Sequence, residues 1–339
     1  MVNPLPIKQG LNPTRAQVPQ HWPEPVSAAD FVWHLVSHQR HRADHDDFAA
    51  VLARFAAGEV VGDGGAPLLP DTPLRPGTFI SFYKYPAAER QVPGELTVLH
   101  RDDNIVVVDK PPFLATMPRG QHIRQTATVK ARVQLDNPEL SPCHRLDRLT
   151  RGVLMFTARQ SVRGAYQTLF DRRVPSKVYE ALTPLPDEAP FAPHPDFADW
   201  RSWHAPTPET PWVLRHRMIK IRGRLSTYLE PGEPNAETHI TGMRVEHREG
   251  RDVCVWRMQP HTGKTHQLRV VLRALGLPII NDPLYAELSD AALVDPAAAL
   301  PSPPHVEDED FTAPMGLIAK ELHFTDPLSG ERRVFVSRF

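Results

Sequence analysis

The order of the expected strands and helices constrains the fold of this chain more than any other sequence feature. Residues 105–109 and 152–157 are short apolar runs, and residues 177–182 alternate in polarity, so all three are typical of strands. Such segments come in clusters with few helices between them, and not in strict strand–helix alternation. The order therefore predicts an α+β fold with a mixed, largely antiparallel central sheet flanked by helices.

Five helices are expected, from apolar positions that recur three and four residues apart. Ser27 and Asp30 form an N-cap for the first, and Gly58 ends the second. The expected helices span residues 31–36, 47–57, 128–135, 158–172 and 263–275. The other expected strands lie near residue 60 and at residues 78–83, 98–100, 241–247, 252–259, 322–325 and 333–336.

Composition shifts divide the chain into three parts. Residues 1–26 are polar and proline-dotted and predict a loosely held arm, and residues 27–86 predict a small α/β module. Residues 96–339 form the large region, in which two segments are expected to be insertions or surface loops. These are the proline-rich residues 183–211 and the acidic, proline-rich residues 286–310.

Two simple counts bear on the cellular compartment. The chain has 2 cysteines, Cys143 and Cys254, too few for a disulfide framework and consistent with a reducing compartment. It has no apolar run of about 18 residues and no apolar core of a signal peptide near its start. We therefore expect a cytoplasmic protein with no membrane contact.

The densest polar cluster is His-Arg-Leu-Asp-Arg-Leu-Thr-Arg-Gly at residues 144–152. Its single carboxylate, Asp147, lies among Arg145, Arg148 and Arg151. Neighbouring guanidinium groups favour the ionised carboxylate, which suits a nucleophile better than a general acid. A solvated Asp–Arg surface cluster would have the same spacing, so both interpretations stay open on the residues alone.

A second cluster lies at residues 261–269, His-Thr-Gly-Lys-Thr-His-Gln-Leu-Arg. A phosphate-binding P-loop would need glycine at position 258, which is Met258, so that interpretation is excluded. His261 and His266 are five residues apart with no cysteine or carboxylate pair, so no metal site is expected. A helix N-terminus carrying Thr, Lys and His remains, which is a plausible phosphate site.

Four blocks occur in a fixed order: Asp-Lys-Pro-Pro at 109–112, HRLDRLTRGVLMF at 144–156, KVYEAL at 177–182, and HTGKTHQLRVVLRALGLPIINDPLY at 261–285. Together they resemble the RluA-type family of RNA pseudouridine synthases. The resemblance covers residues 96–339 and is strongest in the second and fourth blocks.

The resemblance implies three catalytic residues. Asp147 matches the catalytic aspartate, which acts on a nucleotide flipped out of its stack. Flipping the nucleotide costs a few kcal/mol. Tyr179 matches the tyrosine that packs against the target base, and Arg269 the basic residue that ion-pairs with the aspartate. Arg145 matches the arginine that enters the space left by the flipped nucleotide. The other RNA-binding residues implied are His144, Arg148, Thr150, Lys264, Thr265, His266 and Gln267.

The implied activity is the isomerisation of specific uridines to pseudouridine in structured rRNA or tRNA, by a monomer that needs no cofactor and no metal. One alternative is a non-catalytic RNA-binding relative with the same fold, and another is a phosphate-binding hydrolase that uses His261 and His266. The sequence departs from the family after Lys110-Pro111, where a glycine and a histidine are usual, and at Ala286, where glycine is common. Residues 47–83 faintly resemble a ribosomal-protein-S4-like RNA-binding module.

The formal net charge of -1, taken alone, argues against an RNA partner. The charge is unevenly distributed, however: residues 144–177 carry +6, residues 212–224 carry +5, and residues 282–310 carry -8. The sequence thus predicts basic segments at the motifs and an acidic segment away from them, with RNA binding on one face.

Overall fold

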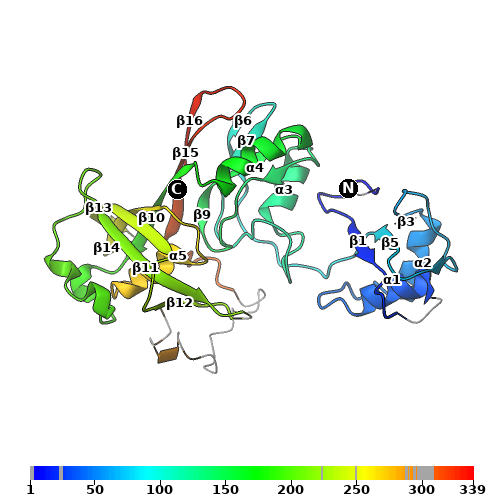
Figure 1. Cartoon of the computed structure of the whole chain (residues 1–339), viewed down its shortest axis with the longest axis horizontal. Helices are drawn as coiled ribbons and strands as arrows, with labels where there is room; N and C mark the ends of the chain where they lie inside the picture. Colours follow the sequence, from blue (N-terminus) through cyan, green and yellow to red (C-terminus); the bar gives the residue numbers. More distant parts are fainter. Residues whose placement is uncertain are drawn as a thin grey trace. The chain divides into compact units, whose positions relative to one another are not determined.

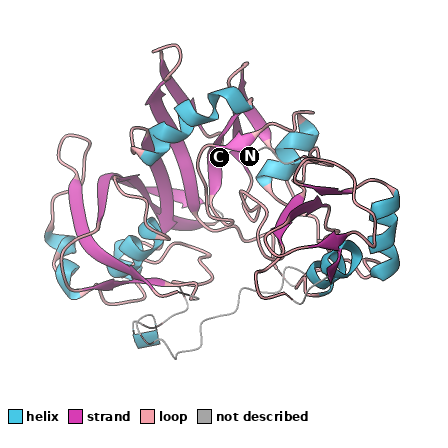
Figure 2. Ribbon diagram, turned by 45° about the vertical axis from the view of Figure 1, so that its right-hand side comes forward, coloured by secondary structure: helices cyan, strands magenta, loops and turns pink. Residues whose placement is uncertain are grey.

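The computed structural model describes residues 4–22, 26–222, 224–248, 250–286, 289, 291, 292, 295 and 309–339 (Figure 1). Helices and strands are both present and do not alternate regularly along the chain, as expected of an α+β fold (Figure 2). Most of the predicted loop at residues 286–310 lies outside the described residues. None of the helices in the described part is long and apolar enough to cross a membrane.

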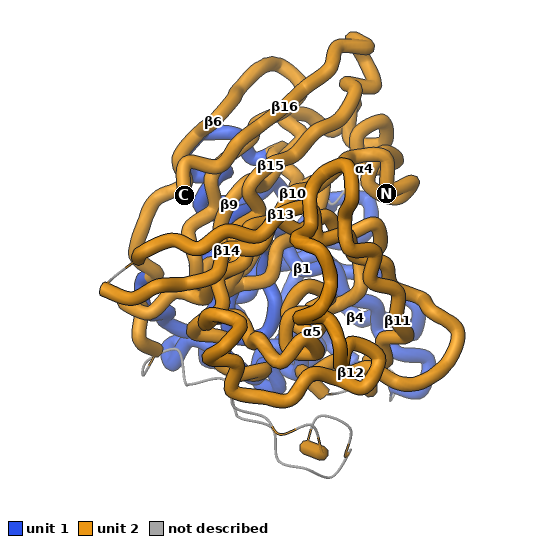
Figure 3. The backbone as a smooth tube through the Cα atoms, turned by 90° about the vertical axis from the view of Figure 1, so that its left-hand side faces the viewer, with its two compact units in different colours: residues 1–91, 117–138 blue, residues 92–116, 139–339 orange. Residues whose placement is uncertain are grey.

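The chain forms two compact units, one of residues 1–91 and 117–138 and the other of residues 92–116 and 139–339 (Figure 3). These units do not coincide with the predicted division at about residue 90. The segment 117–138, which includes helix α3 (Ala127–Gln134), groups with the N-terminal part of the chain.

The N-terminal unit holds two small antiparallel sheets. One has the strand order β1-β5-β3, and β2 pairs with β4 in the other. Ser27, a predicted N-cap, and Asp47, expected to be the first residue of the second helix, accept hydrogen bonds from backbone N–H groups and cap the first two helices. The elements are β1 Thr14–Gln17, β2 Val26–Ser27, α1 Ala28–Ser37, α2 Phe48–Ala56, β3 Val60–Gly62, β4 Pro73–Leu74 and β5 Phe79–Phe82.

The expected loose arm at residues 1–26 is instead tied to this unit over part of its length. Thr14–Gln17 pairs along β5, and Val18, which follows directly, is buried. Pairing with β5 fixes the backbone of this segment. Because β1 is an edge strand with mostly polar side chains, its composition does not indicate a strand.

The larger unit is built on an eleven-stranded sheet with the order β12-β11-β13-β14-β10-β15-β9-β7-β6, in which β16 pairs with β15 and β8 with β9. Its described pairs are antiparallel except β9 with β15, which confirms the predicted mixed, largely antiparallel sheet. The strands are β6 Thr97–Arg101, β7 Ile105–Lys110, β8 Ser141–Pro142, β9 Arg151–Thr157, β10 Ser176–Thr183, β11 Trp212–Lys220, β12 Thr227–Glu230, β13 Ala236–Arg248, β14 Arg251–Pro260, β15 Leu317–Thr325 and β16 Arg332–Val336.

Two helices pack on this sheet through separate apolar clusters. Helix α4 (Arg163–Asp171) contributes Tyr166 to a cluster with Met155 and Leu322. Helix α5 (Gln267–Ala274) contributes Val271 to a cluster with Trp256. The predicted helix at 158–172 is a short 3₁₀ turn at Gln160–Val162 that runs into α4.

Most of the proline-rich segment 183–211 is exposed or partly exposed, but the segment places Phe197 and Trp200 in the core. Three short 3₁₀ turns, Pro186–Glu188, Pro195–Phe197 and Trp200–Ser202, carry it across the sheet. Trp200 is buried between Trp212 and Trp256, with ring centroids 5.9 Å from each. Aromatic burial of this size outweighs the polar and proline-rich character of the segment.

The parallel contact between β9 and β15 depends on Gly152. Its φ of +115° is unfavourable for other residues, and a Cβ there would lie 2.3 Å from the carbonyl oxygen of Ala319. This close approach of the two backbones holds the loop that precedes β9, residues 143–150, beside β15.

Candidate active site

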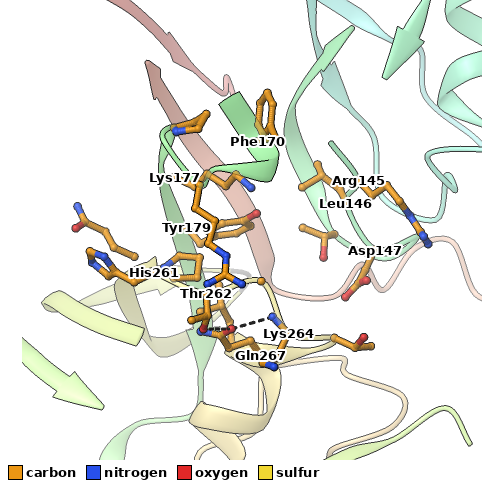
Figure 4. A pocket seen from close by; sticks show the side chains of 18 of the residues that line it. Arg145, Leu146, Asp147, Phe170, Lys177, Tyr179, His261, Thr262, Lys264 and Gln267 are labelled. Atoms are coloured by element: carbon orange, nitrogen blue, oxygen red, sulfur yellow. Dashed lines mark hydrogen bonds between the residues drawn. The ribbon is translucent and has the colours of Figure 1, made fainter. Parts of the chain in front are cut away.

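A pocket of about 720 Å³ opens within the larger unit. The loop that precedes β9, strand β10, and the segment between β14 and α5 line it. In Figure 4, Arg145 and Asp147 lie on the loop at one side, and Lys177 and Tyr179 lie on the strand facing it. The pocket has five Lys or Arg residues in its lining: Arg145, Arg173, Lys177, Lys264 and Arg269.

Asp147 stands on a loop whose backbone is held on both sides of it. Leu146 exchanges hydrogen bonds with the hydroxyl of Thr116, donating at 3.1 Å and accepting at 2.8 Å. Thr150 donates its N–H to the carbonyl of Asp147 at 3.1 Å and closes a turn. With its backbone fixed, the Asp147 side chain stays 42% exposed toward the pocket, and such restraint suits a reacting group.

The other side of this loop is anchored by Lys110 at the end of β7. Its buried ammonium donates to the carbonyls of Pro111, Leu114 and Arg148 at 3.0, 2.7 and 3.2 Å. Burial lowers the pKa of Lys110 to about 7, and the charge of Asp147 partly opposes that shift. Lys110 is therefore a positioning residue that ties β7 to the Asp147 loop.

The predicted ion pair between Arg269 and Asp147 is wrong. Arg269 donates from Nε and Nη2 to the carboxylate of Asp282, at 2.7 and 2.6 Å, and both side chains are buried. The nearest basic group to Asp147 is His266, with 4.0 Å between Nε2 and Oδ2. Arg269 lines the pocket and acts on Asp147 through its charge alone.

His266 occupies the residue before α5 in a left-handed conformation, with φ 57°. The helix was expected from Gly263, but the Gly-Lys-Thr segment is a turn and the helix begins at Gln267. The Nδ1 atom of His266 lies 3.0 Å from the hydroxyl of Tyr285. Burial and the positive charge of Arg269 lower its pKa, so the ring is neutral at neutral pH.

Tyr179 lies on β10 between β14 and β15 and forms a wall of the pocket. Burial is the main cause that raises the pKa of the Tyr179 hydroxyl, and the negative charge of Asp147 raises this pKa further. The hydroxyl therefore stays protonated at neutral pH. A neutral aromatic ring that faces a carboxylate suits packing against a nucleobase.

Three of the predicted RNA-binding residues, two of which line the pocket, have side chains that are buried or hydrogen-bonded within the fold. The amide of Gln267 is buried and holds the loop to β13, through the carbonyl of Glu237 and the hydroxyl of Thr238, both at 2.9 Å. His144 accepts the N–H of Met155 at 3.2 Å and stacks on a phenylalanine of α4. Thr150 lines the pocket, but it is only 2% exposed. Hydrogen-bonding side chains in a motif can serve either role, and burial decides between them.

Arg148, another predicted RNA-binding residue, makes its hydrogen bonds within the protein. Its guanidinium forms two hydrogen bonds to the carboxylate of Glu309, at 2.6 and 2.7 Å, and so is committed within the protein. Together with the pair of Arg269 and Asp282, this contact shows that the expected separation of acidic residues from the motifs does not hold at Asp282 and Glu309. Both described ends of the acidic segment 282–310 neutralise motif arginines.

Three predicted RNA-binding side chains remain exposed: Arg145, Lys264 and Thr265. Lys177 also lines the pocket, with its ammonium 5.1 Å from the ring centroid of Phe170, and sequence reasoning did not single it out. It stands two residues before Tyr179 on the same strand, and the alternation of β10 could have placed both on one face.

The sequence model of the RNA pseudouridylate synthase family matches residues 104–274 of this chain. The dual-specificity RNA pseudouridine synthase RluA of Vibrio vulnificus is 30% identical over 192 residues, which cover 56% of this chain and 69% of the relative. RluA of Escherichia coli K12 is 31% identical over 194 residues, which cover 56% of this chain and 77% of that one.

Among solved structures, human RNA pseudouridylate synthase domain containing 1 superposes with a TM-score of 0.51 at 22% identity. The match covers 73% of this chain and 86% of the human one, and it supports a shared fold. The family model and the two RluA relatives extend the evidence to the sequence itself. The chain therefore belongs to the RluA-type family of RNA pseudouridine synthases, isomerases that convert uridine in RNA to pseudouridine.

Proposed function

We propose that Asp147 is the catalytic aspartate of this enzyme and acts on a uridine flipped out of structured rRNA or tRNA. One observation carries the proposal: the exposed carboxylate of Asp147 is held on a restrained loop and faces Tyr179 across the pocket. Asp171 is the other carboxylate that lines the pocket, and it lies at the end of α4.

The reaction rearranges bonds within one nucleotide. The N1–C1′ bond of uridine breaks, the uracil turns, and C5 bonds to C1′; C5 then loses its proton and N1 carries one. Asp147 can begin this sequence by adding to C1′, by adding to the base, or by removing a sugar proton. Each of these first steps starts at the same carboxylate.

The remaining residues fall into three roles. The protonated Tyr179 packs against the turned-out base and is placed to handle a proton. Arg269 supplies positive charge near Asp147 from its fixed position on Asp282. Exposed Arg145 enters the space left by the flipped nucleotide, and Lys264 contacts phosphate.

The two RluA relatives carry the words dual-specificity in their names, which favours a search in both rRNA and tRNA. We further propose that the enzyme acts as a cytoplasmic monomer and that the module at residues 27–86 contributes RNA contacts. Pseudouridine mapping in RNA from cells with and without the protein would identify the modified uridine.

Asp147→Asn tests the role of the aspartate, and Asp171→Asn is the matched control because it alters the other carboxylate of the pocket. We expect D147N to lose at least about 1,000-fold in rate while RNA affinity and melting temperature stay near those of the parent. D171N should keep most of its rate. Pseudouridine formation by D147N at the parental rate would refute the assignment.

A further inference from the structure

We propose that Glu237, His239 and His261 form a binding site for a divalent transition-metal ion, for which Zn²⁺ is the natural probe. We call these residues the β13–β14 triad. The site is independent of the catalytic proposal, because none of the three residues has a role in it.

The antiparallel pairing of β13 and β14 brings the triad to one face of the sheet. Thr238 is registered with Pro260, and the N–H of His261 donates to the carbonyl of Glu237 at 3.0 Å, which extends the pairing by one residue. His261 therefore lies opposite Glu237, and His239 lies two residues along the same strand. Residues in these positions share a face.

That face is the open one. Thr238, between the two β13 members of the triad, is fully buried, whereas Glu237 and His239 are partly exposed and His261 is exposed. An ion can thus reach the site from solvent, with a position left for water.

The ligand atoms already lie near coordination distance. One donor atom from each residue can be chosen so that all three lie within 4.8 Å of one another. The Nε2 atom of His239 is 2.8 Å from Oε1 of Glu237, and the rings of His239 and His261 have centroids 3.9 Å apart. Zn²⁺ binds at about 2.0–2.2 Å, so its tetrahedral ligands stand about 3.3 Å apart. The 2.8 Å between Oε1 and Nε2 and the 4.8 Å limit for the three donor atoms lie on either side of this value.

Both oxygens of the Glu237 carboxylate have hydrogen-bond partners, Arg215 and His239. Arg215 donates to Oε2 of Glu237 at 2.7 Å and leaves Oε1 to the triad, where a bound ion would replace the contact of Oε1 with Nε2 of His239. The positive charge of Arg215 also opposes the bound cation, so the occupancy of the triad depends on Arg215.

The grouping stands out from other contacts of its kind. His247 with Asp252, His100 with Asp102, and His323 with Glu321 each combine one histidine with one carboxylate. Within the described ranges, the triad is the one set of three such groups close enough to share an ion. His261 also lines the pocket, so a bound ion would add positive charge at its rim.

Zn²⁺ titration of the metal-free full-length enzyme, in competition with a chromophoric chelator, tests the proposal. We expect one equivalent bound, at least tenfold weaker binding in His239→Ala and His261→Asn, and unchanged binding in His247→Ala. His247 is the control because it is an exposed histidine on the same hairpin, paired with a carboxylate. Circular dichroism should show that each variant is folded.

Arg215→Ala provides a test in the opposite direction. Removing a competing cation from the ligand carboxylate should strengthen Zn²⁺ binding by about three- to tenfold, and Co²⁺ bound to this variant should show the absorption of a four-coordinate site. The proposal is overturned if the folded double variant of His239 and His261 binds Zn²⁺ as the parent does. It is also overturned if the parent binds no Zn²⁺ at micromolar concentrations.

Discussion

Arg269 gives both hydrogen bonds of its buried guanidinium edge to Asp282, at 2.7 and 2.6 Å, and not to Asp147. The Asp282 carboxylate also accepts the N–H groups of Leu284 and Tyr285, at 2.9 and 3.0 Å. A single carboxylate thus fixes α5 and the turn that follows residue 281. The carboxylate of Asp147 stays exposed, while Asp282 holds the arginine.

The pair of Arg269 and Asp282 should show strong energetic coupling. Removal of one partner leaves an uncompensated buried charge, so Arg269→Gln and Asp282→Asn should each lower the free energy of unfolding by about 3–5 kcal/mol. The double variant should lose clearly less than the sum of the two. Urea unfolding of the four proteins measures this coupling, and additive losses would show that the pair is not coupled.

The ring and the hydroxyl of Tyr179 should contribute separately to RNA affinity and to the reaction rate. Tyr179→Phe keeps the wall of the pocket, so its RNA affinity should stay within about twofold of the parent, and any loss in rate reports the hydroxyl. Tyr179→Ala should lose more rate than Tyr179→Phe, and RNA affinity as well, because base stacking contributes about 1–3 kcal/mol. Single-turnover rates and RNA binding isotherms distinguish these effects. Equal affinity in the Ala and Phe variants would exclude a packing role.

Gly152 should not tolerate a side chain. Gly152→Ala would place a Cβ 2.3 Å from a backbone oxygen at a φ of +115°, and we expect it to lose more than about 3 kcal/mol or to fail to fold. Gly164→Ala is the control: Gly164 lies in α4 with open space around it. That variant should gain up to about 1 kcal/mol from helix propensity. Thermal unfolding compares the two, and similar melting temperatures would contradict the prediction.

His216, on β11, should contribute to acid instability. It is 4% exposed, and burial lowers its pKa from 6.5 to about 4. Between pH 6.5 and 4 the unfolded chain binds a proton that the folded chain does not, so stability falls as the pH falls. The slope is roughly 1.4 kcal/mol per pH unit.

His216→Phe removes this titration and should reduce the pH dependence of the unfolding free energy by that slope. Urea unfolding at pH 6.5 and pH 4.5 for the parent and the variant measures the difference. Identical slopes would mean that the buried imidazole does not resist protonation. Above pH 7 the two proteins should show parallel pH dependence, since His216 is neutral in both folded and unfolded chains there.

Local patterns were sufficient for much of the fold. The apolar runs at residues 105–109 and 152–157 became β7 and β9, and Ser27 became a helix cap. These features depend on neighbours within a few residues. Strand β11 was missed because His216 occupies a buried position on it and breaks the apolar alternation.

The sequence by itself determined the family, the type of sheet, and the loop that carries Asp147, because motif order and short-range periodicity are written in adjacent residues. The partners of the motif arginines were decided only by the tertiary structure. Glu309 is 161 residues from Arg148 in sequence, and no local pattern pairs Arg269 with Asp282, 13 residues further on. A guanidinium that folding buries must find a carboxylate that is buried with it, since desolvation is offset only within the protein.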